Sequence, residues 1–175
     1  MNPFREYIEV LECAHIGNEF EKFKEAFENH SRIIILGNGG SSSVASHISQ
    51  DYMKFNGKRV SILSDPSMLT MLTNDFGYEN WVSKAIEYYA DSGDTIILIS
   101  SSGTSQNIIN GAKQAKKMSL PIITFSGFDK NNELRKLSNL SFWVDSNEYN
   151  IVEMAHHVWL VSIVDYLCEI KTNEE

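Results

Sequence analysis

The stretch IIILGNGGSSS at residues 33–43 joins an apolar run to a loop of glycine, asparagine and serine. The stretch IILISSSGTS at residues 96–105 repeats this order. In both, a run typical of a buried strand leads through a small-residue loop into a segment with helical character. Amide groups in the first turn of a helix lack acceptors within the helix and attract anions, and serine hydroxyls add donors. The two loops therefore predict a binding site for an anionic group such as phosphate.

Apolar runs and amphipathic segments alternate around these two stretches. The interior runs are almost entirely apolar, as parallel strands are when helices cover both faces of a sheet. We therefore expect an α/β fold with a doubly wound parallel sheet of five strands in the flavodoxin-like order 2-1-3-4-5. The expected strands are residues 32–36, 60–63, 95–100, 122–125 and 140–144, and the expected helices are residues 42–55, 81–90, 106–117, 132–136 and 151–170.

The N-terminal residues have a different pattern. Large apolar residues recur three or four positions apart over residues 4–29, which predicts one or two amphipathic helices. Such helices on a monomer would leave an apolar patch in water, so we expect residues 1–30 to be an oligomerisation segment. Residues 31–172 are long enough to form one domain around a substantial core.

Charge and hydropathy narrow the possible partners. The formal net charge is -8 and no basic run occurs, which argues against a nucleic-acid groove. We find no leader-like segment and expect no apolar run long enough to span a bilayer. These features predict a cytoplasmic protein with neither nucleic acid nor membrane as partner.

The expected sheet order brings the two serine loops together. In open parallel sheets, ligands bind beyond the carboxyl ends of the strands, at the point where the strand order reverses. In the order 2-1-3-4-5 this point lies between the first and third strands, and the two loops follow these strands. We therefore expect both loops to line one crevice.

Two polar motifs follow the first and second strands. His47 and Asp51 are four residues apart on an expected helix and so share a face. They are either a catalytic or metal-binding pair, or an ordinary surface pair. Asn74-Asp75-Phe76-Gly77 is either a turn, which its composition favours, or a polar lip that contacts a sugar hydroxyl.

A third polar group opens the last expected helix. Glu153, His156 and His157 have the spacing i, i+3, i+4, which places them on one face. Because the helix follows the fifth strand, its first turns lie at the same edge of the sheet as the two serine loops. The group is either functional or a solvated or subunit-interface face.

These motifs together resemble the sugar isomerase (SIS) domain family, and within it the phosphoheptose isomerases. The resemblance implies the SIS fold and a homotetramer with active sites at subunit interfaces. It also implies conversion of sedoheptulose 7-phosphate to a D-glycero-heptose 7-phosphate for surface polysaccharide. By position it implies substrate contacts from Asn38, Gly39, Gly40, Ser41, Asn74, Asp75, Ser100, Ser101, Ser102 and Ser105.

The sequence departs from the family where the family binds zinc. His47 matches a family metal ligand, but Asp51 replaces the glutamate that is both base and ligand. Val152 and Leu160 stand where the family has a glutamine and a histidine. At most His47 and Asp51 remain as ligands, whereas zinc sites use three or four protein ligands. The sequence therefore assigns no cofactor and leaves zinc as an alternative, for which His156 or His157 would have to supply a ligand from a shifted or rotated helix. We predict that the catalytic residues come from Glu153, His156, His157 and Asp51.

Two functions fit these observations. An aldose–ketose isomerase acting through an enediol needs a base near C1 and C2, an acid near the oxygens and a firm phosphate anchor. The retained serine loops and the acid–base candidates favour this function. The alternative is a non-catalytic SIS protein that binds a phosphosugar or a protein partner, of the replication-initiator-associated type, and the loss of metal ligands favours that reading.

Overall fold

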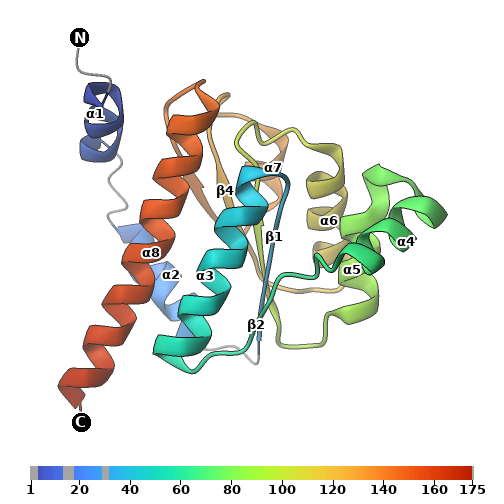
Figure 1. The fold of residues 1–175 in the computed structure, drawn as a ribbon, viewed down its shortest axis with the longest axis horizontal. Coiled ribbons are helices and arrows are strands. Elements are labelled where there is room, and N and C mark those ends of the chain that lie inside the picture. Colours follow the sequence, from blue (N-terminus) through green and yellow to red (C-terminus); the bar gives the residue numbers. More distant parts are fainter. Residues whose placement is uncertain (1–3, 14–17, 29–31, 175) are drawn as a thin grey trace.

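The computed structural model describes residues 4–13, 18–28 and 32–174. A five-stranded parallel sheet in the order β2-β1-β3-β4-β5 forms its centre (Figure 1). This confirms the predicted order. The strands are β1 (Ile33–Gly37), β2 (Val60–Ser61), β3 (Thr95–Ile99), β4 (Ile122–Ser126) and β5 (Leu140–Trp143).

Helices cover both faces of the sheet, as a doubly wound fold requires. One face carries α2 (Asn18–Glu28), α3 (Gly40–Asn56) and α8 (Tyr149–Glu174), with α1 (Arg5–Cys13) against α8. The other carries α4 (Pro66–Phe76), the 3-10 helix η1 (Tyr78–Asn80), α5 (Trp81–Tyr89), α6 (Gln106–Lys117) and α7 (Glu133–Leu137).

Successive side chains along each strand point to opposite faces of the sheet, so each face has its own hydrophobic core. In β1, Ile33 and Ile35 pack toward α3 and α8, while Ile34 and Leu36 pack toward the opposite helices. Every residue of β1, β3 and β4 is buried. Burial on both faces fixes where these strands end, and so it fixes the loops that follow them.

The N-terminal helix α2 belongs to the core of the domain. Phe23 is fully buried, and its ring makes edge contacts with Phe142 and Phe125 at centroid distances of 5.2 and 6.0 Å. Helix α1 keeps Phe4, Ile8 and Leu11 exposed around it. The oligomerisation role of residues 1–30 stays a prediction. The exposed apolar side chains that it relies on lie around α1, whereas α2 packs into the core.

Helix α8 corrects the expectation about apolar runs. Its residues Tyr149–Cys168 are long and apolar enough to cross a membrane, with a mean hydropathy of 1.3. Half of this stretch is buried inside the protein, and Val152 and Leu160 have no exposed surface. The helix lies beside α3 and packs on the sheet, so its apolar character is explained by the core (Figure 1).

Helix α4 was not predicted from the sequence. Asp65 caps it by accepting hydrogen bonds from the backbone N–H groups of Ser67 and Met68 at 2.9 and 3.2 Å, and Pro66 occupies its first turn. An acidic cap followed by proline is a helix-start signal that the sequence does contain. Strand β2 is shorter than expected, and Leu63, predicted to end it, has a positive φ of 42°.

Candidate functional site

The two serine loops leave the sheet side by side. β1 and β3 are adjacent, and their last residues, Gly37 and Ile99, are partners in the parallel register. The loops therefore emerge together at the end of the sheet where α3 and α8 begin (Figure 1). This is the arrangement expected from the strand order.

The first loop opens α3 with free amide groups. Gly39 adopts a positive φ of 53°, and no side chain caps the helix that follows. The N–H groups of Ser42 and Ser43 bond to the Gly39 carbonyl at 3.0 and 3.1 Å, so the N–H groups before them are the ones that can bind a ligand, as at other helix N-termini. Ser41 is buried immediately behind the loop.

Glu153 lies against the start of α3. A Cβ atom on Gly40 would overlap the Glu153 carboxylate, so this contact requires glycine at position 40. Glu153 is half-buried, and its burial raises the pKa of the carboxyl group above its usual value. A carboxyl group beside an anion site, with a raised pKa, has the properties of a general acid or base.

The second loop presents serine hydroxyls ahead of α6. Ser100 and Ser101 are buried, and Ser100 Oγ donates to Ser105 Oγ at 3.2 Å. Ser102 Oγ accepts from the hydroxyl of Thr104 at 3.0 Å. No side chain caps the helix that begins after Ser105, so its first-turn amides also lack side-chain acceptors. Each loop therefore joins free helix amides to small polar side chains.

Asn38 connects the two loops. Its side chain exchanges two hydrogen bonds with the side chain of Asn107 on α6, at 2.9 and 2.8 Å, and Tyr78 donates to its Oδ1 atom at 3.2 Å. Sequence reasoning missed Tyr78 and Asn107. Tyr78 could have been found, because it directly follows the Asn74–Gly77 motif.

The Asn74–Gly77 motif ends α4. Asn74 and Asp75 are exposed in its last turn, where Asn74 Nδ2 donates to Asp75 Oδ1 at 2.9 Å. Gly77 closes the helix with a positive φ of 84°. In the described residues it is Tyr78, next in the chain, that bonds to the first loop.

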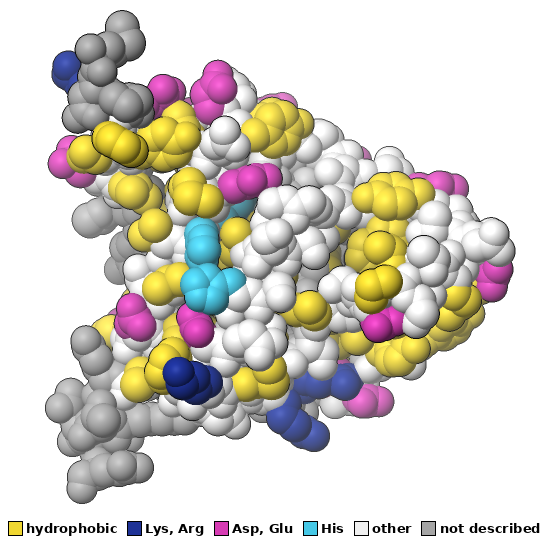
Figure 2. Space-filling view, in the orientation of Figure 1, with side chains coloured by type: hydrophobic (Ala, Val, Ile, Leu, Met, Phe, Trp, Pro, Cys, Tyr) yellow, Lys and Arg dark blue, Asp and Glu magenta, His cyan; other side chains and the backbone are white. Residues whose placement is uncertain are grey.

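His47, Asp51 and His157 form a hydrogen-bonded chain between α3 and α8. His47 Nε2 lies 3.2 Å from Asp51 Oδ2, and His47 Nδ1 lies 2.7 Å from His157 Nε2. Figure 2 shows histidine side chains together on this face, with acidic side chains nearby. Partial burial and the neighbouring His47 lower the pKa of His157 from its ordinary value, against a smaller opposing effect of Asp51, which favours the neutral ring. Asp51 and His47 thus share a hydrogen-bonded chain with His157, and their functional role stays a prediction.

The structure corrects the prediction for His156. Its side chain has no exposed surface, its Nε2–H donates to the carbonyl of Ser126 at 3.1 Å, and its ring packs against Phe125 and Trp159. His156 therefore belongs to the core, while Glu153 and His157 remain at the surface. Burial lowers the pKa of His156 from 6.5 to about 4.

His156 is expected to make folding pH-dependent. Because its pKa is lower in the folded state, the unfolded state binds more protons between pH 6.5 and 4, and stability falls as the pH falls through this window. The difference corresponds to about 3 kcal/mol. We expect urea unfolding to show this loss in the wild type and a smaller loss in His156→Leu. Equal pH dependence in the two proteins would contradict the assignment.

The residues present do not fit the zinc site that the resemblance implies. Val152 packs against Gly127 in the core, and Leu160 is buried. Both ring nitrogens of His47 already face protein partners. Across residues 4–13, 18–28 and 32–174, no group of three or more His, Cys, Asp or Glu side chains is placed to hold a metal ion.

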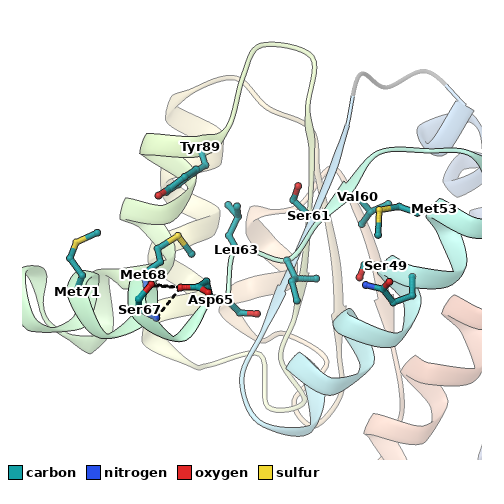
Figure 3. A pocket seen from close by; sticks show the side chains of 13 residues that line it. Ser49, Met53, Val60, Ser61, Leu63, Asp65, Ser67, Met68, Met71 and Tyr89 are labelled. Atoms are coloured by element: carbon teal, nitrogen blue, oxygen red, sulfur yellow. Dashed lines mark hydrogen bonds between the residues drawn. The ribbon is translucent and has the colours of Figure 1, made fainter.

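A separate hollow lies beside the edge strand β2. It has a volume of about 930 Å³ and is lined by residues of α3, α4 and the segment after β2, among them Met53, Met68 and Met71 (Figure 3). The carboxylate in its wall, Asp65, is occupied in capping α4. The hollow contains none of the predicted site residues.

Comparisons with known proteins agree with this geometry. The family model described as SIS domain matches residues 3–127. The phosphoheptose isomerase of Fusobacterium nucleatum is 31% identical over 150 residues, covering 83% of this chain and 77% of the relative. That of Helicobacter pylori strain P12 is 30% identical over 151 residues, covering 83% and 76%. The solved structure of phosphoheptose isomerase GmhA from Neisseria gonorrhoeae has a TM-score of 0.87 at 23% identity over 94% of each chain, a likeness of fold.

Proposed function

This chain belongs to the SIS domain family, and on that premise we propose that it is an aldose–ketose isomerase converting sedoheptulose 7-phosphate to a D-glycero-heptose 7-phosphate. The observation that carries the proposal is the Glu153 carboxylate against Gly40, beside two serine loops that leave adjacent strands. The similar curated relatives are named as phosphoheptose isomerases. The alternative of a non-catalytic binding protein is not favoured.

The second serine loop would hold the phosphate of the substrate, and the first loop would lie at its reacting end, beside Glu153. For the phosphate, the uncapped first turn of α6 offers backbone N–H groups, and the serines of the second loop offer hydroxyls. Such donors bind phosphate without lysine or arginine, which suits a chain of net charge -8. Anchoring the phosphate allows its binding energy to orient the distant reacting carbons.

Glu153 would move the carbon-bound proton. In the forward direction its carboxylate takes a proton from C1 of the ketose, and the electron pair forms the C1–C2 double bond of an enediol. The carboxyl group then returns the proton to C2, and the C1 oxygen becomes the aldehyde carbonyl. The raised pKa of Glu153 suits both halves of this transfer, because the group must accept the proton and then release it.

His157 would move the proton between the two oxygens. The Asp51 carboxylate accepts from His47 Nε2–H, so His47 Nδ1 accepts from His157 Nε2–H. This tautomer leaves His157 Nδ1 without a proton. It can therefore take the proton of the C1 hydroxyl and deliver it to the C2 oxygen while Glu153 acts at carbon.

We propose that the reaction does not require zinc. The support is the donor set: a valine and a leucine occupy two ligand positions, and His157 is hydrogen-bonded to the ring of the remaining histidine. In this proposal Asp51 and His47 orient His157 and hold no metal.

We also propose how the protein assembles and where it acts in the cell. The exposed apolar residues of α1 and of α8, including Met154 and Val158, would be covered in a homotetramer with sites at subunit interfaces. We place the protein in the cytoplasm, without nucleic-acid or membrane partners, in the synthesis of heptose for capsule or lipopolysaccharide. These proposals rest on family membership.

Isomerisation can be tested directly by NMR. The protein is incubated with sedoheptulose 7-phosphate in D₂O, and we expect an aldose to appear with deuterium at C2, because the proton that the Glu153 carboxyl group takes from C1 exchanges with solvent before the group protonates C2. If neither the aldose nor exchange at C1 is seen, while the sugar phosphate still binds, the chain is a binding protein and the proposal is wrong.

Removing two hydroxyls should weaken phosphate binding. We expect Ser102→Ala combined with Ser105→Ala to lower the affinity for a phosphosugar at least about tenfold, because each hydrogen bond to an ionised group contributes roughly 1.5–3 kcal/mol. Calorimetry measures the change. Ser162→Ala on α8 is the control, since this hydroxyl bonds to the carbonyl of Val158. Unchanged affinity in the double variant would show that the serine hydroxyls of the second loop do not bind the phosphosugar.

A further inference from the structure

The side chain of Asn38 has one hydrogen-bonding position left. Its Oδ1 atom accepts from Asn107 Nδ2 at 2.8 Å and from the Tyr78 hydroxyl at 3.2 Å. Its Nδ2 atom donates one hydrogen to Asn107 Oδ1 at 2.9 Å. A carboxamide oxygen has two lone pairs and the nitrogen carries two hydrogens. Within the described part of the chain, one N–H of Asn38 therefore remains for a ligand.

This count decides what Asn38 can bind. With both lone pairs of Oδ1 in use, Asn38 can act toward a substrate only as a hydrogen-bond donor. Its ligand atom must then be an acceptor, such as a carbonyl, enediolate or phosphate oxygen. Asn38 directly precedes the Gly39–Gly40 segment on which the Glu153 carboxylate lies. A donor beside the base is suited to the oxygen on which negative charge develops.

We infer that Tyr78 is a positioning residue that, together with Asn107, holds the Asn38 amide with its free N–H available to the sugar oxygen that becomes negatively charged in the enediolate. The inference rests on the proposed isomerase function. It assigns a role to two residues outside the serine loops. Tyr78 acts through Asn38, because its hydroxyl donates to the Asn38 oxygen.

Helix α6 holds both partners of Asn38 in place. Asn107 is 2% exposed and faces Asn38, while Asn110, one turn later, donates to the backbone carbonyl of Glu79 at 2.8 Å and to Asn80 Oδ1 at 3.2 Å. Asn110 thus fixes η1, the element that carries Tyr78. One helix face therefore sets the position of Asn107 directly and of Tyr78 through η1, so Asn38 is held from two sides.

The test compares Tyr78→Phe with a matched control. Tyr78 and Tyr88 are both 54% exposed, but the Tyr88 hydroxyl makes no hydrogen bond to Asn38, so Tyr88→Phe is the control. We expect Tyr78→Phe to lower kcat, and the affinity for a phosphosugar hydroxamate that mimics the enediolate, about three- to tenfold, the effect of one hydrogen bond. KM and the affinity for inorganic phosphate should stay within about twofold, as should every value for Tyr88→Phe.

A double-mutant cycle separates positioning from a direct or structural role. In an Asn38→Ala background, Tyr78→Phe should no longer weaken hydroxamate binding, because the group through which it acts is gone. The inference would be overturned if Tyr78→Phe left hydroxamate affinity unchanged in the wild-type background. It would also be overturned if Tyr78→Phe caused the same loss of affinity with and without the Asn38 amide. A wild-type protein that binds the hydroxamate but shows no turnover would contradict the proposed function alone, since hydroxamate binding still tests Tyr78.

Discussion

Replacing Glu153 by glutamine is expected to lower kcat about 10²–10⁴-fold, the usual contribution of a positioned general acid or base. The amide is nearly isosteric with the carboxylate, so it can keep the contact with Gly40 while losing the ability to accept a proton. Phosphosugar affinity should therefore change little. Steady-state kinetics, together with calorimetry, separates the two quantities.

The pH profile gives an independent measure of the same residue. The reaction needs ionised Glu153, so kcat/KM should fall as the pH drops through the pKa of this group. Burial raises that pKa above the ordinary 4.5, and the acid limb should therefore lie above 4.5 in the wild type and be missing in Glu153→Gln. Glu148→Gln, which changes an exposed carboxylate just before α8, should keep both the wild-type kcat/KM and the acid limb of its pH profile. Full activity in Glu153→Gln would exclude Glu153 as the base.

The strand pattern made most of the fold predictable. Runs such as 33–36 and 96–99 are apolar throughout because both faces of the sheet are covered. This signal predicted a doubly wound parallel sheet, whose expected strand order made the two loops neighbours. Helix α4 was missed because the Asn74–Gly77 motif was interpreted as part of a connection, although Asp65 and Pro66 mark a helix start.

The last helix shows what spacing alone cannot decide. Glu153, His156 and His157 share one broad face on a helical wheel, but the rotation of α8 against the sheet determines which of them is buried. His156 falls in line with Val152, Trp159 and Ile163, all buried, at spacings of four, seven and eleven residues from Val152. That apolar stripe was a usable signal for His156.

Contacts between distant segments were beyond the reach of the sequence. Asn38 and Asn107 are 69 residues apart, and His47 and His157 are 110 apart. Neither separation carries a periodic signal, because one contact depends on how the first loop meets α6 and the other on how α3 and α8 pack together. The sequence could place each residue near the carboxyl edge, but it could not pair them.

Replacing His157 by alanine is expected to lower kcat about 10²–10³-fold, because proton transfer between the two substrate oxygens would lose its carrier. The expected loss is in kcat, since the second serine loop would still hold the phosphate. Val158→Ala is the matched control, because Val158 is the next residue on α8 and lines the same hollow as His47 and His157 without a group that can transfer a proton.

A proton relay and a metal site would both need His157, so chelator treatment and metal analysis are required to decide between them. In a relay, treatment of the wild type with a chelator should leave kcat unchanged, and elemental analysis should find less than stoichiometric zinc. Asp51→Asn should also reduce kcat, less than His157→Ala does, because the amide can still accept from His47 but orients its ring less strongly. If zinc is stoichiometric and its removal abolishes turnover, His157 is a ligand whose ring has moved from His47, and the relay is wrong. If the chelated enzyme stays active while His157→Ala does not, the hydrogen bond between the two imidazoles has replaced the function of a metal.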